Sequence, residues 1–223
     1  MRLHQISSVY TVKKAIQILL AVIILVLGYL IFESIMTPIR FKKERQHREE
    51  ATIKRLKDIR IAQIAFKSEY ERFTGDFDSL ITFLKTGHFT VIKAIGSAPD
   101  SLIEVMGKPE AEKIALGQGL IERDTIQLSV IDSLFYAGYP VDSIRFVSFT
   151  TGQEFELGAG ELETGSKVRV KVFEAMVPYS ILLEGLDPQL IASYTEERER
   201  ITGYPGLKVG SVDEATNNAG NWE

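Results

Sequence analysis

"YERFTGDFDSLITFL" (residues 70–84) is the stretch in which a long charged helix is predicted to end and a short apolar helix to begin. Glycine readily adopts the backbone angles of a helix C-terminal cap, so we expect Thr74-Gly75 to break the first helix. Asp76 or Asp78 can cap the second helix. The apolar face of that helix is predicted to consist of Leu80, Ile81, Phe83 and Leu84, with Gly87 closing it. The stretch is therefore interpreted as the joint between a helical stalk and a globular head.

Upstream of this joint, residues 40–73 contain no glycine or proline and carry one helical stripe. Spacings of four and three residues connect its members, which are Thr52, Leu56, Ile59, Gln63, Phe66, Tyr70 and Phe73. The periodicity predicts an amphipathic stalk helix over residues 38–74. The favoured interpretation is that its last turns pack onto the following domain. The alternative is a coiled coil with a partner. In that case the contacting residues would be Leu56, Ile59, Phe66, Tyr70 and Phe73.

The N-terminal region predicts a membrane anchor. Residues 15–32, "AIQILLAVIILVLGYLIF", contain no charged residue and as a helix would span roughly 27 Å, close to a hydrocarbon core. We therefore expect a short tail over residues 1–14, an anchor over residues 15–37, and an end or kink of the helix at Pro38. A cleaved signal peptide is the alternative, but no small-residue cleavage site follows the apolar run, which favours an uncleaved single-pass anchor.

Charge is distributed unevenly along the chain. Residues 1–39 carry three basic and one acidic side chain, residues 40–73 carry eleven and six, and residues 74–223 carry twelve and twenty-three, which gives −11 for the last segment. An acidic head is a poor nucleic-acid binder, because the phosphate backbone demands a positive surface. The basic segment after the anchor is either a solvated helix face or a contact with anionic lipid headgroups.

The same basic residues bear on the orientation of the anchor. Arg40, Lys42, Lys43, Arg45 and Arg48 follow the apolar run, whereas three basic residues precede it. The positive-inside rule therefore places the C-terminal part in the cytoplasm.

Residues 75–223 are predicted to form an α+β domain with a small antiparallel sheet packed on the stalk or on short helices, followed by a loop-rich tail. Two short helices are expected between residues 93 and 120. Another is expected from Asp187-Pro188 to Gly203, because Asp is a good cap and Pro suits the first helical position. Alternating apolar and β-branched residues predict strands at 125–130, 143–149, 154–157, 167–177 and 179–185, with a hairpin turn at 163–166.

The sequence carries no recognisable catalytic motif. It has no cysteine and only three histidines, none of them paired at a metal-ligand spacing, and no nucleophile elbow, P-loop or dinucleotide fingerprint. We therefore predict that the chain is not an enzyme and has no cofactor. The one metal candidate is calcium, with oxygen ligands from Asp213, Glu214, Asn217 and Asn218. The favoured alternative is a mobile polar C-terminus.

Trp222, close to the end of the chain, points to a docked tail. A tryptophan at this position suggests that the tail packs on its own domain or on a partner, so Trp222 is a further candidate for partner contact.

Two motifs carry a resemblance to known proteins. "AQIAFKSEYERFTGDFDSL" (62–80) is similar to the "…YK…NGRYP…SL…L" passage of type II secretion pseudopilins and type IV pilins, and "NNAGNWE" (217–223) resembles the "GNW" ending of major pseudopilins. The prepilin cleavage signal, a Gly with a Glu five residues further on, has no counterpart around "SSVYTVKKAIQ" (7–17). The chain as a whole also resembles uncharacterised single-pass envelope proteins of Bacteroidota.

The resemblance implies a pilin-like architecture, an inner-membrane anchor and a periplasmic C-terminal domain. On that basis we expect a membrane-anchored structural or scaffold component of a cell-envelope assembly, such as secretion or pilus-like machinery. It would contact the lipid bilayer and other envelope proteins or further copies of itself. The alternative is a membrane-anchored periplasmic sensor or binding module for a ligand or an envelope polymer.

Overall fold

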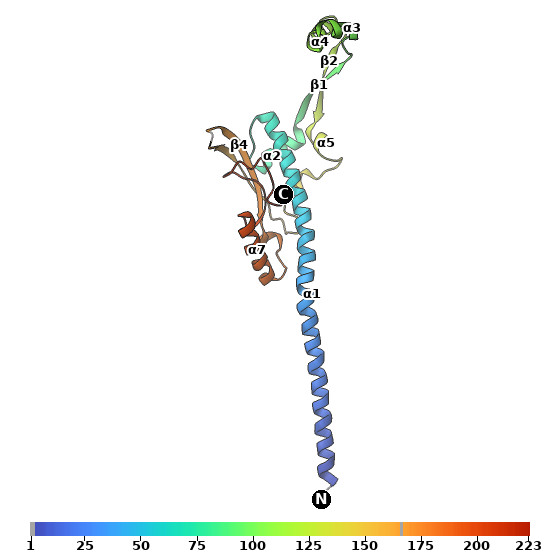
Figure 1. Ribbon diagram of the computed structural model, residues 1–223, viewed down its shortest axis with the longest axis vertical. Helices are drawn as coiled ribbons and strands as arrows, with labels where there is room; N and C mark the ends of the chain where they lie inside the picture. The colour runs from blue at the N-terminus through green and yellow to red at the C-terminus, as the bar shows by residue number, and fades with distance from the viewer. Residues whose placement is uncertain (1–2, 166) are drawn as a thin grey trace. The chain divides into compact units, whose positions relative to one another are not determined.

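The computed structural model describes the backbone of residues 3–165 and 167–223, and their side chains except at residues 3–12, 15, 92–94 and 122–124. The chain is α+β, as predicted: a long N-terminal helix is followed by short helices and small antiparallel sheets (Figure 1). The helices are α1 (Leu3–Tyr70), α2 (Phe77–Thr86), α3 (Asp100–Met106), α4 (Lys108–Gly117), α5 (Val130–Leu134), the 3-10 helix η1 (Val141–Arg145), α6 (Tyr179–Leu182) and α7 (Pro188–Thr202). The strands are β1 (His88–Ile95), β2 (Glu122–Ser129), β3 (Glu156–Glu163), β4 (Arg169–Pro178) and β5 (Gly206–Gly210).

Helix α1 is one continuous helix that contains both the predicted anchor and the predicted stalk (Figure 1). It does not end at Pro38 but continues through it to Tyr70, although a proline inside a helix removes one N–H donor and crowds the carbonyl of the preceding turn. The segment predicted as a tail is also helical from Leu3 onward. From Ile16 the apolar side chains are exposed within the chain, and the helix is long and apolar enough to cross a membrane once.

The chain divides into two compact units. The first consists of Met1–Ala51 and Pro178–Gly206, and so includes the apolar half of α1 together with α6 and α7. The second consists of Thr52–Val177 and Leu207–Glu223. The second unit contains the core that the stalk stripe was predicted to enter.

The stripe on α1 is buried in the second unit. Leu56, Ile59 and Gln63 have no exposed surface, and Phe66 is 4% exposed. Phe66 packs edge-on against Phe83 of α2, with 5.3 Å between the ring centroids. The interpretation that the last turns of the stalk pack onto the following domain is confirmed.

The joint after α1 differs in detail from the prediction. Helix α1 ends at Tyr70, and it is Glu71, not Gly75, that takes the left-handed conformation, with φ of 54°. Gly75 is needed for a different reason, since a Cβ there would lie 3.3 Å from the backbone nitrogen of Ala159 in β3. The segment between α1 and α2 therefore lies directly against the sheet, and Phe73 packs on Phe173 of β4 with 4.8 Å between ring centroids.

A buried side-chain amide holds this joint. The Nε2 of Gln63 donates to the carbonyl oxygen of Thr74 at 2.6 Å, and the backbone N–H of Thr74 donates to Oε1 of Gln63 at 3.1 Å. Both residues are buried, so the amide satisfies two backbone groups that water cannot reach.

The start of α2 is confirmed. Asp76 is the N-cap, and its Oδ2 accepts from the backbone N–H of Ser79 at 2.8 Å and from the Ser79 hydroxyl at 2.7 Å. These hydrogen bonds hold the pKa of the Asp76 carboxyl below its usual value. The buried face of α2 includes the predicted Leu80, Ile81, Phe83 and Leu84.

The strands form two sheets rather than one. β1 and β2 pair antiparallel as an isolated hairpin, in the register His88↔Ser129 to Ile95↔Glu122. The second sheet has the order β3-β4-β5, with β3 and β4 antiparallel in the register Glu156↔Met176 to Glu163↔Arg169.

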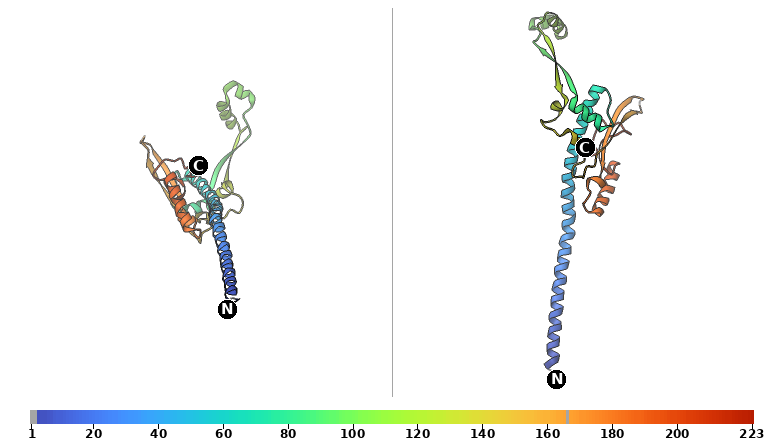
Figure 2. Two further views of the ribbon diagram at one scale, coloured as in Figure 1. Left: turned by 60° about the horizontal axis from the view of Figure 1, so that its bottom comes forward. Right: turned by 180° about the vertical axis from the view of Figure 1, so that it is seen from behind.

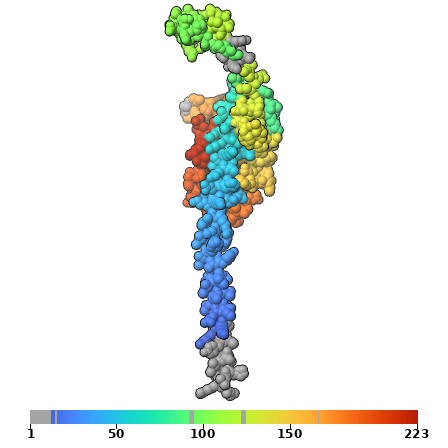
Figure 3. Space-filling model, turned by 90° about the vertical axis from the view of Figure 1, so that its right-hand side faces the viewer, coloured from blue at the N-terminus to red at the C-terminus, as the bar shows by residue number. Residues whose placement is uncertain are grey.

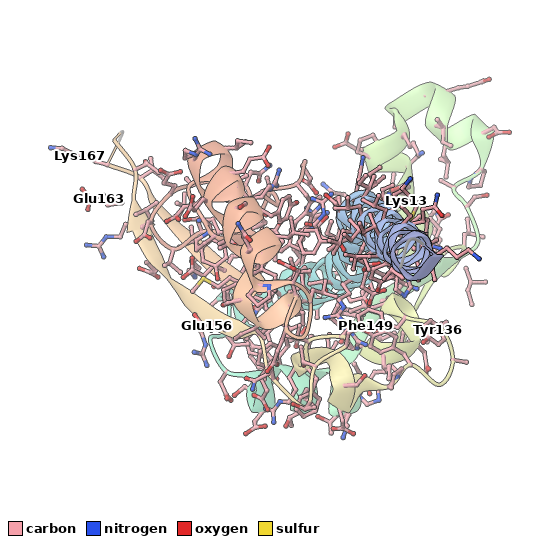
Figure 4. The ribbon with its side chains drawn as sticks, turned by 90° about the horizontal axis from the view of Figure 1, so that it is seen from below. Lys13, Tyr136, Phe149, Glu156, Glu163 and Lys167 are labelled. Atoms are coloured by element: carbon pink, nitrogen blue, oxygen red, sulfur yellow. The ribbon has the colours of Figure 1, made fainter. Side chains whose placement is uncertain are left out.

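The two edges of the three-stranded sheet differ. Beyond β5 the sheet is continued by the C-terminal segment, where Val209 and Gly220 form an antiparallel bridge. At the opposite edge of the sheet, β3 is the outer strand and carries Glu156, Glu161 and Glu163. Figure 4 shows Glu163 and Lys167 at one end of the β3–β4 hairpin and Glu156 at the other.

The predicted hairpin turn at 163–166 falls between β3 and β4. Ser166 lies outside the described residues. On either side of it, the N–H of Thr164 donates to the carbonyl of Val168, and that of Lys167 donates to the carbonyl of Thr164.

Two predicted strands are wrong. Residues 143–149 form part of η1 and a single bridge at Phe146, and residues 179–185 begin with the short helix α6. In both cases a proline, Pro140 or Pro178, precedes the segment as N-cap. Pro suits a helix start, and buried side chains such as Ile144 and Tyr179 pack equally well from one helical turn.

In the first unit, α7 begins and ends as predicted. Oδ1 of Asp187 accepts from the backbone N–H groups of Gln189 and Leu190, and Gly203 closes the helix in the left-handed conformation, with φ of 72°. Asp187 satisfies two of the N–H groups that a helix start leaves open.

Replacement of Gln63 by Ala should destabilise the chain by roughly 2–3 kcal/mol, because it leaves the buried N–H and C=O of Thr74 without partners. The free energy of unfolding can be measured by denaturant titration of the detergent-solubilised protein. Gln127→Ala on the exposed face of the β1–β2 hairpin is the matched control. If Gln63→Ala lay within 0.5 kcal/mol of the wild type, by the usual size of surface effects, the joint would not depend on this amide.

Candidate functional site

The β1–β2 hairpin and the two helices at its end form an arm, residues 88–129, that belongs to the second unit. In the antiparallel register, Phe89 faces Leu128 and Val91 faces Ile126, so these four apolar side chains share one face of the hairpin with Ile95. Thr90 and Gln127 form a pair on the opposite face. The hairpin is thus amphipathic over residues 89–91 and 126–128. Figure 2 shows it from two further sides.

The apolar face of the arm is only partly covered by the described part of the chain: Phe89 and Ile126 are half-buried, but the other three residues are exposed. Val91 is 42% exposed, Leu128 45% and Ile95 50%, although in an amphipathic hairpin these positions normally pack on a second layer. A two-stranded hairpin is marginally stable in water by itself, and a covering layer is what usually stabilises it. We therefore consider this face a candidate contact surface for another molecule.

The end of the arm is a small helical tip, residues 96–121. α3 and α4 enclose a cluster of buried side chains from Ala98, Ala111, Ala115 and Ile121. Outside this cluster, Val105 is 78% exposed, Met106 48% and Leu120 46%, so the tip carries exposed apolar side chains of its own. Figure 3 shows the tip in green.

The tip also contains a hollow of about 380 Å³ between the segment after β1 and the helices α3 and α4. Ile103, Leu116 and Ile121 supply its apolar lining, while Asp100, Glu112 and Lys108 supply charges of both signs. Such a mixed lining fits an amphipathic peptide surface better than a single charged ligand.

The stalk residues considered for partner contact lie mostly inside the second unit. Leu56, Ile59, Phe66 and Phe73 are at most 5% exposed, so they are already used by the chain's own core. Tyr70 is 52% exposed and packs on Phe66 with 4.5 Å between ring centroids. Of the stalk set, only Tyr70 therefore has a surface open to a partner.

The C-terminal segment is docked on its own domain, one of the two possibilities that Trp222 suggested. Asn221 pairs with Lys208 of β5 in both directions: its backbone N–H donates to the Lys208 carbonyl at 3.0 Å, and its Oδ1 accepts from the Lys208 N–H at 3.1 Å. A side chain at position 220 would overlap the indole of Trp222, so Gly220 provides the space for that ring. Arg60 of α1 donates to Oε1 of Glu223 at 2.7 Å.

The four calcium candidates do not form a carboxylate cluster. Asp213 and Glu214 are exposed, and their backbone N–H groups donate to the hydroxyl of Ser211. Asn217 and Asn218 instead border a hollow that also contains two lysines. Within the residues whose side chains are described, no three His, Asp or Glu side chains come close enough to hold a metal. Calcium binding and the absence of enzymatic activity both stay predictions.

The basic residues after the apolar part of α1 fall into two groups. Arg40 pairs with Glu33 at 3.2 Å, Arg48 with Glu44 at 2.9 Å, and Arg45 lies 3.9 Å from Glu49. Lys42 and Lys43 are exposed, and neither of them forms an ion pair with a side chain that the structure describes. Of this basic segment, these two lysines are the side chains best placed to meet anionic headgroups.

Within the first unit, α7 and the segment before it contact α1 through Tyr194 and through Arg48. The hydroxyl of Tyr194 donates to Oε1 of Glu49 at 2.7 Å, and the guanidinium of Arg45 lies 4.1 Å from the Tyr194 ring centroid. Arg48 donates to the carbonyls of Leu182 and Glu184. Burial, followed by the hydrogen bond to Glu49, raises the pKa of Tyr194, which therefore stays protonated at neutral pH. We interpret these contacts as structural.

Comparison of the chain with family models, with curated proteins and with solved structures finds no match in any of the three. The geometry of the chain is therefore the basis for the functional proposals that follow.

The arm was not predicted from the sequence, because strand β1 was not predicted. The signal was present in "HFTVIKAI" (88–95), where Phe89, Val91 and Ile95 fall on alternate positions among β-branched neighbours. Its partner, the strand around residues 125–130, was predicted. The two were not connected, because the residues between them look like an ordinary helical linker rather than the tip of a hairpin.

Acidification should release the docked C-terminal segment. The hydrogen bond from Arg60 holds the pKa of the Glu223 carboxyl below its usual value. A carboxyl with a lowered folded-state pKa contributes stability above its unfolded pKa, and this contribution is lost as the pH falls through the folded pKa. The emission of Trp222, the only tryptophan, should therefore shift to longer wavelength between pH 7 and about pH 3.

Glu223→Gln should show part of the same shift already at pH 7, whereas Glu214→Gln should not, because Glu214 is exposed and its side chain forms no ion pair in the described structure. Circular dichroism would separate release of the segment from unfolding. An unchanged emission maximum in Glu223→Gln would show that the ion pair does not hold the tail.

Proposed function

We propose that this chain is a single-pass membrane-anchored scaffold that binds another cell-envelope protein through the apolar face of its arm. The observation that carries the proposal is the exposure of Val91, Ile95 and Leu128 on one face of the hairpin, together with exposed apolar residues on the tip. Burying such a side chain from full exposure contributes about 1.5–3 kcal/mol, and because these three are 42–50% exposed, a partner that covers them gains about half of that for each.

Charge favours a basic partner over a second copy of the same chain. The tip, residues 96–121, carries Asp100, Glu104, Glu110 and Glu112 against Lys108 and Lys113, for a net −2, and residues 74–223 together carry −11. Two identical acidic arms would repel each other when laid face to face. A partner with an apolar centre and a rim of Lys or Arg would complement the face in both respects.

The membrane part of the proposal rests on α1. Its apolar segment is compatible with one membrane span, and Lys42 and Lys43 follow that segment on the exposed surface. We propose a periplasmic head because of the pilin-like motifs around the joint and at the tail. The count of basic residues predicts the opposite orientation.

Site-specific photo-crosslinking in intact cells tests the arm. A photoreactive residue at Val91 or at Leu128, on the apolar face, should give one and the same adduct with a second protein. The same residue at Thr90 or Gln127, on the opposite face, should give none. The adduct should weaken when Glu104 and Glu110 are replaced by Lys, because the rim of the partner is expected to be basic.

Three outcomes would contradict the proposed contact. Equal adducts from both faces would indicate random encounter, and no adduct at either position would indicate an unoccupied face. An adduct of twice the chain's mass would show self-association in place of a second protein.

Protease treatment of cells with a permeabilised outer membrane tests the orientation. We expect the head to be digested while a cytoplasmic marker survives, which would place residues 75–223 in the periplasm. Protection of the head while a periplasmic marker is cut would instead agree with the basic-residue count. The partner would then have to be sought on the cytoplasmic side.

A further inference from the structure

A second hollow in the second unit lies between the end of α1, strand β4 and the segment after β5. We call it the lysine pocket. It has a volume of about 240 Å³ and is lined by Lys67, Val170, Lys171, Val172, Ser211, Ala215, Thr216, Asn217 and Asn218. It is smaller than the cavities that hold cofactors or drug-sized ligands, so any ligand would be a small molecule or a single functional group of a larger one.

The charges of the lysine pocket are all positive. Lys67 and Lys171 are the only charged residues of its lining, and neither forms an ion pair with a carboxylate in the described part of the chain. The Nζ of Lys171 donates to the carbonyl of Glu71, directly after α1, while the Nζ of Lys67 lies 4.8 Å from the ring centroid of Phe73. Both ammonium groups are thus held at the end of α1, but their charge is not neutralised.

The remaining polar lining offers hydrogen-bond donors. The hydroxyl oxygen of Thr216 is buried and has no hydrogen-bond partner. Asn217 and Asn218 both take the left-handed conformation, with φ of 53° and 60°, and their backbone N–H groups donate no hydrogen bond within the described structure. Arg60 donates to the carbonyl of Asn218 and so fixes this turn from α1.

From this combination we propose that the lysine pocket binds a small oxyanion, a phosphate or a carboxylate group. Two ammonium charges and a polar lining that includes Thr216, whose hydroxyl has no partner within the described residues, match the needs of such an anion, and charge-assisted hydrogen bonds are the strong ones. The same two ammonium charges disfavour calcium at Asn217 and Asn218, since like charges repel. The proposal is independent of the arm and would add a ligand-dependent element to the scaffold.

A purely structural role of the lysines makes a different prediction. Cations near a helix C-terminus stabilise it, and Lys171 at the Glu71 carbonyl could serve that purpose alone. Lys67 contacts an aromatic ring instead, so its replacement by Gln should change anion binding more than the stability of the ligand-free protein. Thr216→Val tests the donor set in the same way, because valine has the same shape and removes only the unpartnered hydroxyl.

The experiment measures thermal unfolding of the full chain in a non-ionic detergent at pH 7, titrated with inorganic phosphate, with acetate, and with chloride at matched ionic strength. We expect phosphate or acetate, but not chloride, to raise the melting temperature in a saturable manner. The stronger of the two oxyanions identifies the class of ligand group. Lys67→Gln and Thr216→Val should each weaken the apparent affinity, by about ten-fold for the lysine. Lys167→Gln, in the β3–β4 turn outside the pocket, should leave it unchanged.

The proposal is overturned if neither oxyanion stabilises the protein beyond chloride. It is also overturned if Lys67→Gln, Thr216→Val and Lys167→Gln all respond to the oxyanion as the wild type does. Circular dichroism of each ligand-free variant confirms that it is folded before the titrations are compared.

Discussion

The buried amide of Gln63 is the interaction on which the second unit depends. It bonds both backbone groups of Thr74 and thereby fixes where the chain leaves α1. With that turn in place, Phe73 reaches Phe173 of β4, Gly75 lies against β3, and Asp76 starts α2 in the position where Phe83 meets Phe66. An apolar side chain at position 63 would fit the helical stripe equally well, but it would leave the joint without a partner for its buried polar groups.

Much of this architecture is predictable because it rests on local chemistry. The stalk stripe, the Asp76 cap and the limits of α7 follow from spacing and capping residues within one or two turns of helix. The errors occurred where tertiary packing decides. Residues 179–185 have the composition of a strand, yet Tyr179 is fully buried from the helical turn α6. The left-handed residue after α1 is Glu71 and not Gly75, which instead lies close to the backbone of β3.

The two candidate sites were harder to predict than the fold, and for different reasons. The arm requires that residues 88–95 pair with residues 122–129, on the other side of the tip. No local sequence pattern predicts such a pairing. The lysine pocket brings together Lys67 on α1, Lys171 on β4 and Asn217 near the end of the chain, which are far apart in sequence. The residues of the tail were correctly recognised as polar and turn-forming. Whether a cation or an anion would bind near the tail depends on the charge of the surrounding residues. Those charges come from α1 and β4, which contact the tail only in the folded chain.

The acidic residues of β3 have a consequence for copies of the protein that meet at high concentration. The edge beyond β5 is occupied by the chain's own C-terminal segment, whereas β3 presents an outer strand to its surroundings. Such a strand can recruit the same strand of a neighbouring molecule and start an aggregate. In an antiparallel encounter of two β3 strands, Glu156 of one would meet Glu163 of the other, and like charges placed opposite each other in a sheet are destabilising. Three glutamates on this strand are therefore expected to disfavour pairing of β3 with the same strand of a neighbouring molecule, because charged side chains on an edge strand oppose edge-to-edge contact.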